Sequence, residues 1–381
     1  MIALLALIPV AIWLYLLAGR GMFWVMGERD DVNAPPAPAS WPSVVAVVPA
    51  RNEADVVARS IGSLLAQDYP GDFKIILVDD QSSDDTADAA RALPGAGRLT
   101  VMSGAPRPPG WTGKLWAVSQ GVAVAGSPDY LWLTDADVEH VPDNLRHLMA
   151  RAEQGKLVLT SLMVKLHCKS WAEAYLIPAF VFFFAMLFPY PWVNDPKKKT
   201  AAAAGGCMLV KRDALERAGG IEAIRAEIID DCALGRALKA QGPIWLGLTE
   251  RAASIRPYAG VAEIRAMVAR SAYAQLGYSL LALIGTFIGM IAVYAAAPLL
   301  AILARDSAQA SGILAWAAMT LAFQPILKFY RLSPLWGLVL PLIGFVYAAF
   351  TLDSAIQHWR GRGGMWKGRA QAMGPNLKNL S

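Results

Sequence analysis

Long apolar stretches occupy both ends of the chain, and a more polar block lies between them. Towards the C-terminus, residues 277–304, 312–329 and 334–352 each approach the ~20 apolar residues that an α-helix needs to cross a bilayer. Short, more polar segments separate these three stretches. We therefore predict C-terminal transmembrane helices at residues 277–354, followed by a basic tail at 355–381.

The first apolar stretch, residues 1–17, contains no charged side chain. Aromatic side chains near its end, such as Trp13 and Tyr15, are typical of membrane interfaces. A cleaved signal peptide has a basic segment before its apolar core, whereas the first basic residue here, Arg20, follows the apolar stretch. We therefore favour an uncleaved transmembrane anchor at residues 1–26 over a signal peptide.

Between the apolar ends, short apolar runs alternate with segments of helical periodicity. The runs are residues 44–48, 73–78, 99–102, 130–133 and 157–162. Continuous apolar runs separated by helices predict a buried and mostly parallel sheet. The block at 44–276 is therefore expected to be an α/β domain, with Asn52 capping its first helix near Glu53. A proline-rich segment at 27–43 is expected to be an extended linker.

One apolar stretch, residues 171–192, lies inside the predicted α/β block and is rich in phenylalanine around Pro178. A single membrane crossing there would place the motifs before and after it on opposite sides of the bilayer. Since these motifs are expected to build one site, we interpret the stretch as an interfacial or re-entrant helix. The alternative is a helix buried in the core of the soluble domain.

Composition agrees with a chain that combines membrane helices and a soluble domain, since 55% of the residues are hydrophobic and 17% are charged. The formal net charge of +5 is compatible with nucleic-acid binding, but no motif of that kind accompanies it. Attraction to anionic lipid headgroups is the simpler interpretation, because Arg360, Arg362, Lys367 and Arg369 cluster in the tail. The three cysteines have no CxxC spacing, so neither a disulfide framework nor a zinc site is predicted, which fits a reducing cytoplasm.

Acidic residues follow two of the predicted strands. Asp79 and Asp80 come after the second run, and Asp135 and Asp137 come after the fourth. Ligands of open α/β sheets bind at the carboxyl ends of strands, so these carboxylates are expected to face a binding crevice. Alternate carboxylates at one strand end can share Mg²⁺ or Mn²⁺, which also contacts phosphate oxygens. Taken alone, the first pair is also typical of a turn and a helix cap.

A third acidic pair, Asp230 and Asp231, opens a predicted helix. A carboxylate at this position can act as a general base that deprotonates an acceptor hydroxyl. The alternative is structural, because the helix macrodipole favours acidic side chains in a first turn.

Five short motifs follow one another along the chain. They are Pro-Ala-Arg-Asn-Glu at 49–53, Asp-Asp-Gln-Ser at 79–82, Asp-Ala-Asp at 135–137, Gly-Gly-Cys at 205–207 and Asp-Asp at 230–231. In this order they resemble the inverting family 2 glycosyltransferases, over residues 44–271. Within that family, residues 109–117 and 363–369 are similar to the hopanoid-biosynthesis-associated glycosyltransferases, whereas ceramide glucosyltransferases are more distant.

The resemblance implies a GT-A nucleotide-sugar-binding domain and assigns roles to its motifs. The residues implied to bind the donor are Pro49, Arg51, Glu53, Asp79, Asp80, Lys114 and Asp135. Asp137, together with Asp135, is implied to hold the divalent cation, and Asp231 is implied to be the catalytic base beside Asp230. The residues implied to border the acceptor site are Gly205, Gly206 and Cys207.

The chain departs from the family pattern at two motifs. The base motif is commonly Glu-Asp but reads Asp-Asp at 230–231. The Gln-x-x-Arg-Trp motif of processive and sphingolipid members reads Met-Val-Ala-Arg-Ser at 267–271, and only Arg270 remains as a catalytic-site partner for the donor diphosphate. The loss argues against synthesis of a long polymer.

The sequence therefore predicts a multi-pass enzyme of a bacterial-type inner membrane, with its catalytic domain in the cytoplasm. We expect it to move a sugar from a nucleotide-sugar, such as a UDP-sugar, to a hydroxyl of a hopanoid or other lipid with inversion. One alternative is a polyprenyl-phosphate sugar transferase, and another is a membrane protein that binds a nucleotide-sugar without turnover. The side of the basic tail stays open, because three C-terminal spans would place it outside, against the positive-inside rule.

Overall fold

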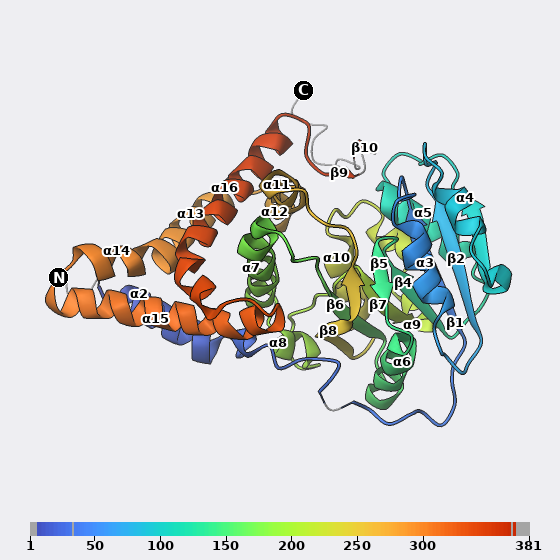
Figure 1. Cartoon of the computed structure of the whole chain (residues 1–381), viewed down its shortest axis with the longest axis horizontal. Helices are drawn as coiled ribbons and strands as arrows, with labels where there is room; N and C mark the ends of the chain where they lie inside the picture. The colour runs from blue at the N-terminus through green and yellow to red at the C-terminus, as the bar shows by residue number, and fades with distance from the viewer. Residues whose placement is uncertain (1–5, 33, 367–368, 371–381) are drawn as a thin grey trace. The chain divides into compact units, whose positions relative to one another are not determined.

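The computed structural model describes residues 6–32, 34–366 and 369–370, and the chain divides into two compact units (Figure 1). The helical unit comprises Met1–Gly27, Cys168–Pro191 and Tyr258–Gly363. The α/β unit comprises Glu28–His167, Trp192–Pro257 and Gly364–Ser381. Each unit is therefore assembled from segments that are far apart in the sequence.

The α/β unit is built on an eight-stranded sheet in the order β3-β2-β1-β4-β7-β6-β8-β5. The strands are β1 (Val44–Ala50), β2 (Phe73–Asp79), β3 (Leu99–Ser103), β4 (Tyr130–Thr134), β5 (Val138–His140), β6 (Leu159–Lys165), β7 (Cys207–Lys211) and β8 (Ile244–Ser254). All five predicted strands are confirmed, as β1, β2, β3, β4 and β6. Four of the seven pairings within this sheet are parallel, so the predicted mostly parallel α/β sheet is confirmed too.

Helices pack on this sheet and complete its core. They are α3 (Val57–Leu65), α4 (Thr86–Arg91), α5 (Gly113–Val124), α6 (Asn144–Gly155), α9 (Arg212–Arg217) and α10 (Asp230–Lys239). Every residue of β1 and β4 is buried, as a sheet covered on both faces requires. Helix α5 packs on β1 and β2, which brings its N-terminus to the carboxyl ends of these parallel strands.

The start of the first helix differs from the prediction. Helix α3 begins at Val57, and Asn52 lies outside it with a positive φ of 51°. The Asn52 side chain instead accepts a hydrogen bond from the backbone N–H of Ser83 at 2.9 Å. Asparagine tolerates the left-handed region, so Asn52 forms a turn that ties the loop after β1 to the loop after β2.

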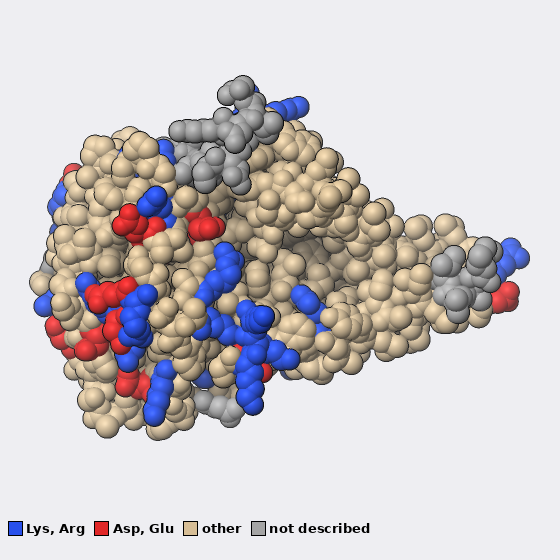
Figure 2. All heavy atoms as spheres, turned by 180° about the vertical axis from the view of Figure 1, so that it is seen from behind, with Lys and Arg blue, Asp and Glu red and all other residues tan. Residues whose placement is uncertain are grey.

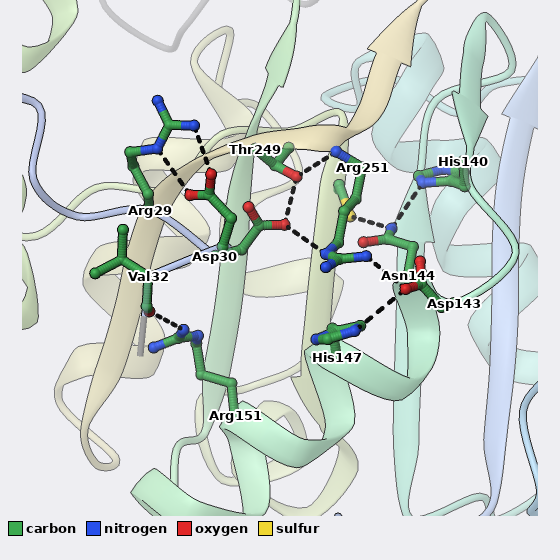
Figure 3. A network of polar contacts seen from close by, with 12 residues as sticks. Arg29, Asp30, Val32, His140, Asp143, Asn144, His147, Arg151, Thr249 and Arg251 are labelled. Atoms are coloured by element: carbon green, nitrogen blue, oxygen red, sulfur yellow. Dashed lines mark hydrogen bonds and ion pairs between the residues drawn. The ribbon is translucent and has the colours of Figure 1, made fainter. Parts of the chain in front are cut away.

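The segment after the first apolar helix joins the sheet before the proline-rich stretch begins. Arg29 forms a parallel β-bridge with Leu248 of β8. The neighbouring Asp30 is buried, accepts a hydrogen bond from the Thr249 hydroxyl, and lies 3.6 Å from Nε of Arg251 (Figure 3). These contacts anchor residues 28–31 to the α/β unit.

The helical unit contains eight α-helices among the described residues. They are α2 (Ile8–Leu14), α7 (Trp171–Leu187), α11 (Val261–Ala269), α12 (Ala272–Gln275), α13 (Leu280–Met290), α14 (Ala296–Leu303), α15 (Asp306–Phe329) and α16 (Leu340–Trp359). A short helix, α8 (Tyr190–Asn194), spans the boundary between the units.

In the part of the chain that the structure describes, three helical stretches are long and apolar enough to cross a membrane, at Leu280–Leu303, Asp306–Phe329 and Pro334–Trp359. They match the three C-terminal stretches predicted from the sequence. At the N-terminus, the apolar helix Ile8–Gly19 is shorter than a span requires, and residues 1–5 of the predicted anchor lie outside the described residues. Lys367 and residues 371–381 of the basic tail lie outside them as well.

Helix α7 belongs to the helical unit. Its Phe182 packs edge-on against Phe323 of α15, with ring centroids 5.2 Å apart. The hydroxyl of Tyr347 on α16 donates to the carbonyl oxygen of Leu176 at 2.8 Å. Helix α7 is therefore packed among the apolar helices, and a capping box between Ser170 and Glu173 defines its start.

Candidate active site

Three acidic residues and one lysine meet where β4 ends and where α5 and α10 begin. The Lys114 ammonium lies 2.9 Å from a carboxylate oxygen of Asp135 and 3.3 Å from one of Asp230. Asp135 follows β4, Lys114 lies in the first turn of α5, and Asp230 opens α10. A small cavity beside them is lined by Pro49, Lys114, Asp135, Gly205 and Asp230. The structure thus brings four of the predicted site motifs together.

Two backbone N–H groups fix the carboxylate of Asp231. Gly205 donates to Oδ2 at 3.0 Å, and Cys232 donates to Oδ1 at 2.7 Å. A Cβ atom on Gly205 would lie 3.3 Å from the Lys114 ammonium and 3.4 Å from Oδ2 of Asp231, which is tighter than most side-chain contacts. The absence of a side chain at Gly205 therefore lets the backbone approach both groups closely.

The surroundings shift the pKa values of Asp231 and Lys114 in ways that suit proton transfer. Burial, reinforced by the neighbouring charge of Asp230, raises the pKa of Asp231 to about 6, although Lys114 acts in the opposite direction. Burial also works against the charge of Lys114, but Asp135, Asp230 and Asp231 together raise its pKa above the ordinary value. At neutral pH, Lys114 is an ammonium and Asp231 is a carboxylate with unusual affinity for a proton.

A second group of carboxylates surrounds Arg256, which follows β8. Arg256 forms an ion pair with the buried Glu53, and its Nη1 lies 3.3 Å from Oδ2 of Asp55. Its Nε lies 3.5 Å from Oδ2 of Asp137. Asp135 and Asp137 come from one strand end, yet their side chains pair with different cations, Lys114 and Arg256.

The loop after β2 is held in place by Arg51. Its guanidinium donates to the backbone carbonyl oxygens of Asp80 and Gln81. The Asp80 side chain is fully buried, with a carboxylate oxygen 4.0 Å from Nη1 of Arg51. Oδ1 of Asp79 accepts a hydrogen bond from the backbone N–H of Ser82. This is the turn-forming role that the sequence also allowed for the first acidic pair.

The comparisons with known proteins decide which kind of site this is. Residues 45–219 match the model of the glycosyl transferase family 2. This part of the chain is therefore similar to a family 2 glycosyltransferase domain. The matched region includes β1, β2 and β4 with Glu53, Asp80 and Asp137, which lie on the loops that follow these strands.

Two individual proteins are similar to this chain, one in sequence and one in fold. The succinoglycan biosynthesis protein ExoU of Rhizobium meliloti (strain 1021) is 33% identical over 109 residues, which cover 28% of this chain and only 30% of that protein. The solved mannosyltransferase PcManGT of Pyrobaculum calidifontis, in complex with GDP-Man and Mn²⁺, has a TM-score of 0.57 at 18% identity. The superposition covers 95% of this chain and 100% of that one, so the likeness shows a shared GT-A-like fold.

Three further residues were predicted for the glycosyltransferase site, namely Gly206, Cys207 and Arg270. The thiol of Cys207 is buried in the core, where it accepts from Nε1 of Trp132 at 3.4 Å. Gly206 uses its carbonyl oxygen to accept from the Thr134 hydroxyl at 2.8 Å. Arg270 follows α11 in the helical unit, so its predicted role towards the donor diphosphate stays a prediction.

The carboxylates at the end of β4 have the chemistry that Mg²⁺ and Mn²⁺ prefer, since these ions take oxygen ligands. Among the described residues, no group of three His, Cys, Asp or Glu side chains is arranged to hold a metal ion. The guanidinium of Arg256 already occupies a position among Glu53, Asp55 and Asp137, so this group of carboxylates accommodates positive charge. Asp137, with Asp135 beside it, therefore fits a cation that draws its other ligands from phosphate and water.

Sequence reasoning missed Arg256 and Asp55. Their contacts depend on the end of strand β8, which was not among the predicted runs although its first half, Ile244–Leu248, is apolar. The backbone N–H of Ile255 donates to the carbonyl oxygen of Asp137 at 2.9 Å, and this places Arg256 beside the end of β4. An arginine directly after a strand is the only signal in the sequence, and it is a weak one.

Proposed function

We propose that the protein is a membrane-bound glycosyltransferase that moves a sugar from a nucleotide-sugar to a hydroxyl group of a lipid acceptor, with inversion. The observation that carries the proposal is the position of Asp231. Two backbone N–H groups orient its carboxylate beside Lys114 and the end of β4, and its pKa is raised to about 6. This is the arrangement that a general base requires.

In this mechanism Asp231 accepts the proton of the acceptor hydroxyl. The hydroxyl oxygen forms a bond to the anomeric carbon of the sugar while the bond from that carbon to the nucleoside diphosphate breaks. The Lys114 ammonium offsets negative charge on the departing diphosphate. When bound at Asp137 and Asp135, a divalent cation supplies further charge stabilisation to the same phosphate oxygens.

The nucleotide is proposed to lie along the ends of β1 and β2. The buried Asp80 and the backbone held by Arg51 border this region. A carboxylate at a strand end can accept a hydrogen bond from a base N–H or a ribose hydroxyl. UDP-sugars are the donors that we expected from the sequence. Since PcManGT is in complex with GDP-Man, GDP-sugars are candidate donors as well.

A lipid-linked saccharide is a second candidate acceptor. It is supported by the similarity to a succinoglycan biosynthesis protein, which is a protein of polysaccharide synthesis. The acceptor would then be a sugar hydroxyl on a membrane-bound carrier, and Asp231 would have the same role. A polyprenyl phosphate acceptor needs no strong base, so retention of transfer by Asp231→Asn would favour that alternative.

The proposal is tested with a panel of UDP- and GDP-sugars and a membrane lipid extract as the acceptor source. Purified protein is expected to form a new glycolipid that mass spectrometry detects, with one nucleoside diphosphate released for each sugar transferred. Asp213→Asn, a change in the first turn of α9, serves as the matched control for the active-site variants. Donor binding without any transfer or release would identify a non-catalytic binding protein.

The rate of transfer is expected to depend on the protonation of Asp231. Since burial raises the pKa of this carboxylate, the protonated and inactive form becomes the major one as the pH falls through about 6. We therefore expect kcat/KM to fall with a midpoint near pH 6, above the range of an ordinary aspartate. The measurement is kcat/KM between pH 4.5 and 8 with saturating cation, and a plateau that extends down to pH 4.5 contradicts it.

We also propose that α7 lies at the membrane interface and that basic residues of the α/β unit attract anionic lipids. Trp171, at the start of α7, has 68% of its surface exposed, and it stacks on Tyr175. Aromatic side chains of this kind are typical of the headgroup region. Lys and Arg side chains gather on one face of the protein (Figure 2), and Lys197, Lys198 and Lys199 form an exposed run.

Photolabelling in native membranes with a lipid probe is expected to modify α7 around Trp171. Helix α6 of the α/β unit is the matched internal control, because it covers the sheet of the soluble fold and should remain unlabelled. Peptide mapping by mass spectrometry gives the ratio of labelling between the two helices. Equal labelling of α6 and α7 would contradict the proposal that α7 lies at the membrane interface.

A further inference from the structure

Arg256 is held next to the predicted metal ligand by the register of the sheet. Strands β5 and β8 pair in antiparallel fashion, with Val138 opposite Ser254. The hydrogen bond from the N–H of Ile255 to the carbonyl oxygen of Asp137 extends this pairing by one step. Arg256 therefore reaches the Asp137 carboxylate because the backbone brings it there.

The contacts of Arg256 are unequal. The ion pair with Glu53 is hydrogen-bonded and largely buried, since the Glu53 side chain is only 8% exposed. Towards Asp137 the closest approach is 3.5 Å from Nε, and this Nε is buried without a hydrogen-bond partner among the described residues. A buried donor without a hydrogen-bond partner costs free energy of folding. The contact of Arg256 with Asp137 is therefore weaker than its contact with Glu53.

A divalent cation on Asp137 would lie within a few ångströms of this guanidinium. Two cations at such a separation repel each other, most strongly where protein replaces water. The carboxylate of Asp137 therefore cannot bind the divalent cation and the Arg256 guanidinium equally well at the same time. Because Glu53 holds Arg256 more firmly than Asp137 does, the guanidinium can release Asp137 and remain attached to the protein.

We propose that Arg256 is a counter-ion of Asp137 in the metal-free enzyme and gives up this carboxylate when the divalent cation binds. In the metal-free enzyme Arg256 thus acts through Asp137. The inference rests on the metal-dependent donor site of the proposed function. It goes beyond that function by stating that metal binding is an exchange of one cation for another.

The exchange has a consequence for the order of binding. A metal ion alone must displace Arg256 from Asp137, which weakens its binding. A nucleoside diphosphate offers phosphate oxygens to the displaced guanidinium, whose planar donors suit phosphate. Metal and nucleotide are therefore expected to bind with positive coupling, and part of this coupling passes through Arg256.

The test is the affinity of the full-length, detergent-solubilised protein for Mn²⁺, with and without UDP or GDP. This affinity is measured from the electron paramagnetic resonance signal of free Mn²⁺. Arg256→Gln is expected to bind Mn²⁺ about tenfold more tightly than wild type when no nucleotide is present. The same variant should lose most of the enhancement that the nucleotide produces in wild type. Arg91→Gln removes a surface arginine that pairs with Asp88, and it should behave as wild type.

A second variant covers the case in which Arg256→Gln does not fold. Arg256→Lys keeps one positive charge, but a single ammonium cannot serve both Glu53 and Asp137, so Mn²⁺ should bind about threefold more tightly than in wild type. The inference is overturned if neither folded variant binds Mn²⁺ more tightly than wild type. Absence of Mn²⁺ binding to wild type with either nucleotide overturns the metal assignment itself.

Discussion

Replacing Asp231 by asparagine is expected to lower sugar transfer by ~10²–10⁴, or roughly 3–5 kcal/mol of barrier, while donor binding persists. An amide has nearly the shape of the carboxylate, but it cannot accept the proton of the acceptor hydroxyl. Its oxygen can still accept a hydrogen bond from one of the two backbone donors, Gly205 and Cys232. The donor is proposed to contact other elements, so its dissociation constant should change little. Single-turnover transfer and donor titration on the same preparation measure both quantities.

The control separates catalysis from a structural role at the start of a helix. Asp213 also lies in a first helical turn, but it pairs with Arg217 on the surface at 3.0 Å. Asp213→Asn should leave transfer unchanged and cost at most about 0.3–1 kcal/mol of stability. If Asp231→Asn behaves like this control, Asp231 is not the base, and Asp230 becomes the next residue to test.

Removal of divalent cations is expected to abolish transfer, and Mg²⁺ or Mn²⁺ should restore it. The physical reason is the charge that develops on the leaving diphosphate, for which a metal ion supplies several kcal/mol of stabilisation. Asp137→Ala should lower kcat/KM by roughly 10³-fold even with added cation, since each tenfold step is about 1.4 kcal/mol. The measurement is nucleoside diphosphate release with excess chelator and after re-addition of each metal.

A carboxylate on the same unit but away from the site serves as the reference. Asp68 pairs with Arg146 at 3.0 Å on the surface, and Asp68→Ala should retain both activity and metal dependence. Full turnover in excess chelator would show that the metal is dispensable. In that case Lys114 and Arg256 would be the main groups of the α/β unit that balance the phosphate charge.

The sequence predicted those parts of the fold that a local pattern determines. Strands β1 and β4 are continuous apolar runs because both faces of the sheet are covered, and such runs are visible without knowledge of their partners. Strand β5 has only three residues, and β8 becomes irregular after Leu248, where its register with β6 shifts. The strand character of β5 and of the second half of β8 comes from their pairing with each other, which no local window contains. The first half of β8, Ile244–Leu248, is an apolar run that a local pattern does show.

The same division applies to the active site. The acidic residues were predicted because strand ends and helix starts are local features, and the structure brings Asp135 and Asp230 together around Lys114. The choice of partner for each carboxylate was not predictable, because it depends on the register between distant strands. Arg51 was expected at the donor site, but its structural role was not predicted. Its guanidinium holds the backbone of the loop that carries Asp80.

The anchoring of residues 28–31 on β8 has a consequence for how the protein is made. Translation produces the first of these segments early, whereas its partner Leu248 emerges only after α7 has been synthesised. Strand β6 likewise cannot pair with β8 until β8 has been synthesised. Helix α7, which we propose to lie at the membrane interface, is therefore synthesised while the sheet still has unpaired edges, which are prone to aggregation. A ribosome-bound chain that ends before Ile244 should accordingly be protease-sensitive in its α/β part, and one that extends past Pro257 should be resistant.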